Sequence, residues 1–371
     1  MITIKTRCEK ELAYSFPYPK KDVLFIDIET TGFSPQTSAL YLIGALYYEE
    51  NSWQVIQWFA NDYTSEKEIL TAFFAFQQNF SYLIHFNGNG FDIPFLEKKC
   101  LQHELTDTSY KFIQGFDIYK AIFPYKKRFL TENLKQKTLE QFLQISRDDL
   151  YSGKELIKIY RKYLKEKTCS KEREELEQLL LLHNHDDLVG MLQFSSILYL
   201  KDLLDGSILP YNLQLEITEN SLLFTGELPF SFSCLLTSKN NNHNLTIKNN
   251  FFSLEIFLYE GDLYFFYPNY KDYFYLPKED IAIHKSVATY VDKNFREKAK
   301  KENCYTKKTG IFLPVFQLDF GPHFRKSYSD PQHFILFEHT FLKQKDLQTS
   351  YLQDFFCNNP ELLLSSAPYP V

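Results

Sequence analysis

Three apolar runs near the start of the chain predict strands. Residues 23–29 form the first, and residues 39–48 and 53–59 form two more, separated by a polar stretch at 49–52 that is typical of a hairpin turn. The apolar residues of each run are too continuous for a strand with one face in water. We therefore expect a buried strand followed by an antiparallel hairpin.

The next hundred residues alternate between helix and strand patterns. A helix with regularly spaced apolar residues follows Ser65, a short strand is expected at 82–85, a helix runs to about Cys100, and another strand lies near 112–118. An antiparallel hairpin that leads into alternating helices and strands predicts a mixed α/β sheet with helices on its faces.

The pattern changes in the second half of the chain. Residues 150–200 have helical spacing, whereas short alternating strands and turn signals begin at about Ile208. We expect a β-rich second domain with a meander at about 210–277. The predicted domains are residues 1–205 and 206–371.

Composition narrows the class of protein. Lys and Arg number 41 and Asp and Glu 47, so the net charge of -6 excludes attachment to nucleic acid by bulk charge but allows a local basic patch. The six cysteines include no Cys-x-x-Cys pair, which is typical of reduced thiols and argues against a zinc ribbon. The sequence opens without the apolar core of a signal peptide, and no apolar run approaches the length of a membrane span. We expect a cytoplasmic protein that does not contact membranes.

Two carboxylates interrupt the first strand. Asp27 and Glu29 are two residues apart, so their side chains project from the same face. Like charges on an apolar strand repel each other and resist burial, and a hard divalent cation compensates them through oxygen ligands. Two carboxylates at an exposed strand end would need no cation, and this pair alone does not decide between the two interpretations.

A second candidate follows the strand at 82–85. Gly88 and Gly90 allow a tight turn, after which Asp92 begins a helix. Taken alone, Asp92 is better explained as a helix N-cap than as a ligand.

A third candidate lies in the helical region. His183 and Asp187 are four residues apart and share one face of a helix. They are either a solvated helix end or a metal carboxylate with a proton acceptor beside it. The adjacent His185 and Asp186 also suggest an HD-type metal phosphohydrolase, but the other ligands of that class have no plausible places in the sequence.

In order, Asp27-x-Glu29, Asn87-x-x-x-Phe91-Asp92 and His183-x-x-x-Asp187 resemble the three motifs of the DEDD exonucleases, which have the ribonuclease H-like fold. The chain is similar, more narrowly, to the YprB-type ribonuclease H-like domain proteins of bacteria, because residues 137–149 and the Ser-Gly that follows resemble the spacer found there. The resemblance covers about residues 20–200. It implies a ribonuclease H-like mixed sheet with flanking helices, followed here by a β-rich (α+β) C-terminal domain.

The resemblance also implies a reaction. Phosphodiester bonds would be hydrolysed with two divalent cations, Mg²⁺ or Mn²⁺, and the implied metal ligands are Asp27, Glu29, Asp92 and Asp187. Thr30, Thr31 and Asn87 would lie near the terminal nucleotide. The expected function is a 3′–5′ exonuclease on single-stranded DNA or RNA. The alternative is a nucleic-acid-binding or protein-interaction module that retains the fold with little turnover.

The third motif departs from the family pattern. These exonucleases usually have Tyr-x-x-x-Asp or His-x-x-x-x-Asp, whereas this chain has histidine at the tyrosine spacing. His183 is therefore expected either to accept a proton from the attacking water or to orient that water. Asp186 is a competing ligand, but its spacing from His183 matches neither family form.

A basic segment stands out in the second half. Residues 285–308 contain eight Lys or Arg against three acids, and a helix is expected at about 285–301. We expect Lys293, Arg296 and Lys300 to contact phosphates, with an ordinary solvated face as the alternative. Residues 262–275 hold eight aromatic side chains, which are expected to be core rather than a stacking surface.

Overall fold

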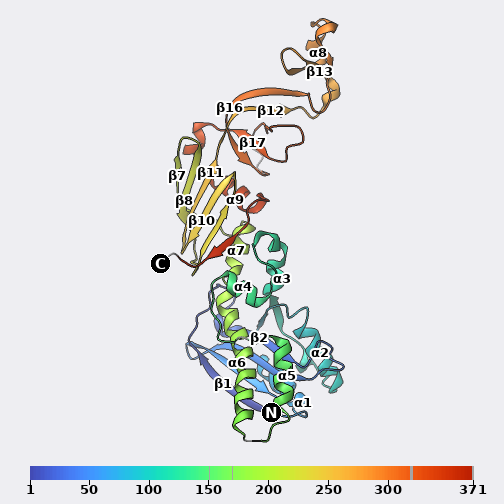
Figure 1. Cartoon of the computed structure of the whole chain (residues 1–371), viewed down its shortest axis with the longest axis vertical. Helices are drawn as coiled ribbons and strands as arrows, with labels where there is room; N and C mark the ends of the chain where they lie inside the picture. Colours follow the sequence, from blue (N-terminus) through green and yellow to red (C-terminus); the bar gives the residue numbers. More distant parts are fainter. Residues whose placement is uncertain (150, 169, 318–320, 370–371) are drawn as a thin grey trace. The chain divides into compact units, whose positions relative to one another are not determined.

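The computed structural model describes residues 1–149, 151–168, 170–317 and 321–369. Contacts between Cα atoms divide the chain into two compact units, shown in Figure 1. The N-terminal unit holds residues 1–127 and 131–201, and the C-terminal unit holds residues 128–130 and the chain from 202 onward. None of the described helices has both the length and the apolar character that crossing a membrane requires.

The N-terminal unit is built on one six-stranded sheet with the order β1-β4-β3-β2-β5-β6. Its strands are β1 (Ile2–Cys8), β2 (Val23–Thr30), β3 (Leu40–Glu49), β4 (Ser52–Phe59), β5 (Tyr82–His85) and β6 (Gln114–Asp117). Its helices are α1 (Glu66–Gln77), α2 (Asp92–Gln102), α3 (Ile118–Ile122), α4 (Gln136–Phe142), α5 (Gly153–Tyr163) and α6 (Lys171–Phe194), and α7 (Ile197–Leu204) runs on into the second unit. The predicted mixed sheet with flanking helices is confirmed.

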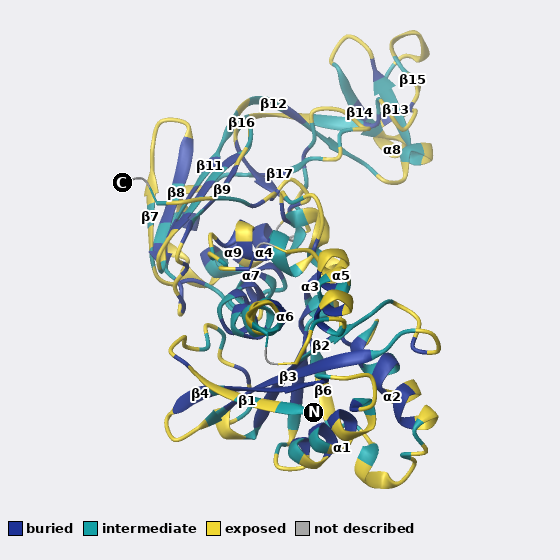
Figure 2. Ribbon diagram, turned by 60° about the horizontal axis from the view of Figure 1, so that its bottom comes forward, coloured by how far each residue is buried: buried dark blue, intermediate teal, exposed yellow. Residues whose placement is uncertain are grey.

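Strand β2 lies at the centre of this sheet. It pairs antiparallel with β3 and parallel with β5, and β3 is buried over almost its whole length (Figure 2). Ile26 and Ile28 pack in one core cluster with residues of α1 and α2. Because neighbouring strand residues face opposite ways, Asp27 and Glu29 are on the other face of the sheet. Helix α6 packs on β2 and β3 and contacts Asp27 there.

Strand β1 was not predicted. It pairs along its full length with β4 at the edge of the sheet, from Ile2 with Phe59 to Cys8 with Trp53. Its exposed residues include Lys5 and Arg7, which gave this segment the pattern of a polar lead-in. Charged residues of this kind are common on edge strands, where they discourage pairing with another chain.

The C-terminal unit consists mainly of antiparallel strands. Its six-stranded sheet has the order β18-β9-β10-β11-β8-β7, and two three-stranded sheets have the orders β12-β16-β17 and β14-β13-β15. The strands are β7 (Tyr211–Ile217), β8 (Ser221–Glu227), β9 (Leu235–Lys239), β10 (His243–Lys248), β11 (Phe251–Phe257), β12 (Tyr259–Phe266), β13 (Tyr273–Leu276), β14 (Ile281–His284), β15 (Glu297–Lys298), β16 (Tyr305–Val315), β17 (His333–Leu336) and β18 (Ser365–Ala367), and the helices are α8 (Lys285–Ala288) and α9 (Lys345–Asn358). A β-rich C-terminal region is confirmed.

Two details of that prediction are wrong. The strands after residue 210 do not form one meander, because β11 returns to pair with β8 and β12 joins a different sheet. The helix expected at 285–301 is replaced by the four-residue α8, a 3-10 turn at Lys293–Phe295 and the short strand β15. Glu297 and Lys298 pair with β13, so pairing in the sheet overrides the local helical pattern.

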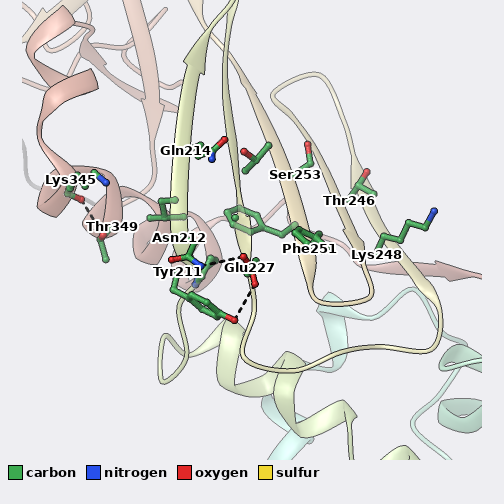
Figure 3. A pocket seen from close by; sticks show the side chains of 15 residues that line it. Tyr211, Asn212, Gln214, Glu227, Thr246, Lys248, Phe251, Ser253, Lys345 and Thr349 are labelled. Carbon is green, nitrogen blue, oxygen red and sulfur yellow. Dashed lines mark hydrogen bonds between the residues drawn. The ribbon is translucent and has the colours of Figure 1, made fainter.

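Helix α9 supplies much of the core of the six-stranded sheet. The ring of its Tyr351 stacks on Phe224 of β8, with the centroids 5.8 Å apart. A cavity of about 1020 Å³ lies along β7, β8, β10 and β11, where Glu227 accepts hydrogen bonds from Tyr211 and Asn212 (Figure 3).

Candidate metal centre

Side chains from β2 and α6 meet on one face of the N-terminal sheet. The Nε2 atom of His183 lies 3.5 Å from Glu29 Oε1 and 3.4 Å from Asp187 Oδ2. These three residues offer ligand atoms that all lie within 4.8 Å of one another. The helical spacing predicted from the sequence therefore brings His183 and Asp187 to the face of the strand that carries Glu29.

Asp27 is held in the same region by an amide from α6. Asn184 Nδ2 donates to Asp27 Oδ2 at 2.8 Å, and Gln57 Nε2 donates to Asn184 Oδ1 at 2.9 Å. Gly44 lies opposite Asp27 on β3, and a Cβ atom there would overlap the carboxamide of Asn184. The approach of α6 to β2 thus depends on glycine at position 44.

Asp92 is the first residue of α2 and is buried. The turn before it is organised by Asp117, whose carboxylate accepts hydrogen bonds from the backbone N–H of Asn87 at 2.9 Å and of Asn89 at 3.2 Å. Burial raises the pKa of Asp92 to about 7, although backbone hydrogen bonds from Asp92 itself and from Ile28 oppose this rise. The contact with Ile28 ties the start of α2 to β2.

Burial and neighbouring acids raise the pKa values of Asp27 and Glu29 as well. Burial is the largest cause for Asp27, whose pKa lies well above its usual value, and the charges of Asp187, Glu29 and Asp92 add to it. Burial likewise raises the pKa of Glu29, again with contributions from Asp187 and Asp92. The fold therefore brings all four predicted acids within electrostatic reach of one another, and full ionisation of the cluster is costly without added positive charge.

His183 has a partner that sequence reasoning missed. Its Nδ1 atom lies 2.6 Å from Asp149 Oδ2, which also accepts from Lys137 Nζ at 2.8 Å. Burial opposes ionisation of Asp149, but hydrogen bonds from Lys137, the Tyr151 backbone and His183 hold its pKa below the usual value. With Nδ1 directed at a carboxylate, Nε2 is left facing the acids. Asp149 lies in the spacer at residues 137–149, which the sequence analysis used only for the family resemblance and not for the chemistry of the site.

The same spacer supplies a largely buried arginine side chain. Arg147 Nη2 donates to Asp187 Oδ1 at 2.5 Å, and Nη1 donates to Glu140 Oε2 at 2.8 Å. One oxygen of Asp187 is therefore held by Arg147 while the other faces His183. Glu29 is arranged in the same way, since Tyr41 donates to its Oε2 at 3.4 Å and its Oε1 faces His183.

Asp186 has a different setting. Its Oδ2 accepts hydrogen bonds from the backbone N–H groups of Asp148 at 3.1 Å and Asp149 at 2.8 Å. Asp186 thus holds the loop that delivers Asp149 to His183. This placement favours Asp187 over Asp186 as the acid of the third motif.

The predicted substrate contacts fall into two groups. Thr30 ends β2, and its hydroxyl donates to Gly32 O at 2.8 Å. The hydroxyl of the next residue, Thr31, accepts from Ala39 N at 2.8 Å, and Asn87 is exposed with a φ of 60°. Lys293, Arg296 and Lys300 belong to the C-terminal unit instead. Lys293 and Lys300 are exposed, and the Arg296 guanidinium lies 4.9 Å from the Phe274 ring centroid.

Comparison with known proteins agrees with the architecture of the N-terminal unit. Residues 24–199, slightly less than half of the chain, match the sequence profile of the RNase H superfamily. The chain thus contains an RNase H-like domain followed by a β-rich region. The YprB-type subfamily stays a prediction, and no curated protein matches the sequence.

Two solved structures show a weaker similarity. One is the family B DNA polymerase of the hyperthermophilic archaeon Pyrobaculum calidifontis, at 13% identity and a TM-score of 0.39 over 68% of this chain and 34% of the polymerase. The other is the zinc-bound complex of Escherichia coli exonuclease I with single-stranded DNA, at 13% identity and a TM-score of 0.26 over 55% of this chain and 54% of the exonuclease. The chain thus spans about a third of the polymerase and about half of the exonuclease.

Proposed function

We propose that the chain is a metal-dependent nuclease, a DEDD-type 3′–5′ exonuclease that hydrolyses phosphodiester bonds in single-stranded DNA or RNA. One observation carries the proposal: the acids of β2, α2 and α6 lie within electrostatic reach of one another in an RNase H-like domain, and burial together with this neighbouring charge raises the pKa values of Asp27, Glu29 and Asp92. Such a cluster is costly to a protein that makes no use of it, because buried like charges destabilise the fold.

The donor set fits hard divalent cations such as Mg²⁺ or Mn²⁺, which prefer carboxylate oxygens. Glu29 and Asp187 each have one oxygen held by a protein donor and the other directed at the shared centre. The proposed ligands are Asp27, Glu29, Asp92 and Asp187. When bound, two such cations would neutralise these acids and stabilise charge on the attacking and leaving oxygens of the phosphodiester.

His183 is the proposed general base. Asp149 Oδ2 lies 2.6 Å from Nδ1 and accepts a hydrogen bond from the Nδ1–H group, so that Nε2 has a lone pair with which to take a proton from the attacking water. A carboxylate partner of this kind fixes the orientation of the ring and raises its basicity. The Nε2 atom also lies close enough to Glu29 and Asp187 to be a metal ligand itself.

The test is cleavage of end-labelled oligonucleotides with Mg²⁺ or Mn²⁺, comparing matched DNA and RNA and comparing linear with circular substrates. We expect stepwise shortening from the 3′ end and no cleavage of circles. Asp27→Asn should abolish cleavage and leave the fold intact, because it removes an anion and adds no bulk. Glu49→Gln, at the far end of β3, is the matched control and should keep full activity. Near wild-type cleavage by Asp27→Asn would contradict the proposal.

A second experiment assigns the role of His183. General-base help is worth about 10² to 10⁴ in rate, so His183→Ala should lose about that much and lose the acidic limb of its pH–rate profile. If His183 is a metal ligand instead, the rate of His183→Ala should recover at high Mn²⁺. Oligonucleotide binding without any cleavage by the wild type would favour the alternative, a binding module on the same fold.

A further inference from the structure

The aromatic-rich stretch 262–275 divides between two faces. On β12, Leu263 and Phe265 pack into a small core with residues of β16 and β17 and with Phe324. The alternate residues Tyr264 and Phe266 face the other side. The prediction that this stretch is core therefore describes only one of its faces.

The other face of β12 borders a cavity of about 410 Å³. Four aromatic rings line it, two from β12, one from β16 and one from the loop before β17, namely Tyr264, Phe266, Tyr305 and Tyr328. The Phe266 centroid lies 5.4 Å from that of Tyr305 and 5.5 Å from that of Tyr328. The volume lies in the range of small-molecule sites, and half of the lining residues are aromatic.

These rings are held in place by the fold. The backbone N–H of Tyr264 donates to Arg325 O, and that of Arg325 donates to Tyr264 O, both at 2.9 Å. The hydroxyl of Tyr305 donates to Asp280 Oδ1 at 2.5 Å. A ligand that enters the cavity therefore meets preorganised rings and loses little binding free energy in ordering them.

The charges around the rings indicate the kind of ligand. One acid, Glu302, and one base, Lys326, line the cavity, and a second base, Arg325, lies against two of its rings. The Arg325 guanidinium lies 5.0 Å from the Phe266 centroid and 5.2 Å from that of Tyr328. It already occupies the position over these rings that an organic cation would take, and it repels a second cation. An anionic ligand with a flat ring is favoured instead, because guanidinium planes and aromatic rings both stack on bases.

We propose that this cavity binds an unpaired nucleobase of single-stranded nucleic acid, with the adjoining phosphate beside Arg325. The proposal rests on the proposed function, in that nucleic acid is the substrate, and adds a binding site outside the acid cluster.

The test measures binding without hydrolysis. The full chain is titrated in EDTA against fluorescently labelled poly(dT) and poly(U), and against a duplex, with fluorescence anisotropy as the signal. Tyr328→Ala and Phe266→Leu each remove one ring, and their Kd for single strands should rise about 5- to 100-fold, the usual range for a lost base stack. Tyr290→Ala is the control, because this tyrosine is 91% exposed and lies outside the cavity, and its Kd should be unchanged.

Three results would overturn the base site. The first is an unchanged Kd for Tyr328→Ala, a loop variant whose melting temperature should equal that of the wild type. The second is no wild-type affinity for single strands. The third is displacement of the oligonucleotide by tetramethylammonium, which would mark a cation site. Mn²⁺-dependent hydrolysis of a labelled dinucleotide by the wild type, assayed in parallel, tests the nuclease separately. Cleavage by the wild type together with an unchanged Kd of the ring variants refutes only the base site. A raised Kd of the ring variants without cleavage by the wild type refutes only the nuclease.

Discussion

Asp92→Asn should change how the stability of the metal-free N-terminal unit depends on pH. The pKa of Asp92 is about 7 in the fold against 3.8 for an ordinary aspartate, so the folded state binds this proton more tightly than the unfolded state does. Its contribution to stability is therefore present at low pH and is lost as the pH rises through about 7. A difference of about three pH units corresponds to about 4 kcal/mol, of which about 3 kcal/mol is lost between about pH 5 and pH 8.

The two tryptophans make this loss measurable. Trp53 and Trp58 are the only ones in the chain, and both lie in β4, so their fluorescence reports unfolding of the N-terminal unit alone. Urea unfolding in EDTA is compared for wild type and Asp92→Asn at about pH 5 and about pH 8. Taking the difference between the two proteins cancels titrating groups outside the acid cluster, such as His85, whose pKa burial lowers.

Wild type should lose about 3 kcal/mol more than Asp92→Asn over this interval. Saturating Mn²⁺ at the higher pH should stabilise wild type and stabilise the variant less, because cations bind the ionised cluster. Glu97→Gln removes an exposed carboxylate from the same helix and should follow the wild-type profile. Parallel profiles for wild type and Asp92→Asn would refute the electrostatic description of the cluster.

Three further predictions concern residues around the metal centre. Asp149→Asn should lower kcat about 10- to 100-fold by weakening the hold on His183, and an unchanged kcat would count against that role. Arg147→Met leaves Glu140 buried without its cation and should destabilise the N-terminal unit by about 3–5 kcal/mol in urea unfolding. Adding Glu140→Gln should restore only part of this loss, because Asp187 also loses the guanidinium, and the absence of either effect refutes the buried ion pair. Phe33 is 86% exposed just after β2, so Phe33→Ala should raise KM for oligonucleotides about 5- to 100-fold at constant stability and kcat, whereas an unchanged KM would exclude stacking on a base.

Local periodicity was enough to predict the parts of the site that depend on a single element. Strand alternation puts Asp27 and Glu29 on the same face of β2. Helical spacing puts His183 and Asp187 on the same face of α6. Strands β2 and β3 also followed from their apolar runs, because burial on both faces leaves few polar residues in them, whereas the edge strand β1 has no such run and was missed.

Contacts between distant segments were not predictable in this way. Asp149 meets His183 from 34 residues away, and Arg147 reaches Asp187 across 40, so neither contact leaves a trace in local spacing. Asn184 is uncharged and belongs to none of the three motifs. It nevertheless donates a hydrogen bond to Asp27, which is possible because Gly44 has no Cβ atom to overlap its carboxamide. The helix expected at 285–301 was wrong because local spacing suggested a helix, whereas pairing with the distant strand β13 decides the structure at Glu297 and Lys298.

The long separation between β2 and α6 also has a consequence for synthesis of the protein. Asn184 contacts Asp27 across 157 residues, so every strand of the N-terminal sheet leaves the ribosome before α6 does. Until that helix docks, the carboxylates of β2 remain open to water and repel one another only weakly. The electrostatic cost of the centre therefore falls on the last docking step of this unit rather than on formation of its hairpin. Divalent cations should accelerate that closing step and leave the earlier ones unchanged.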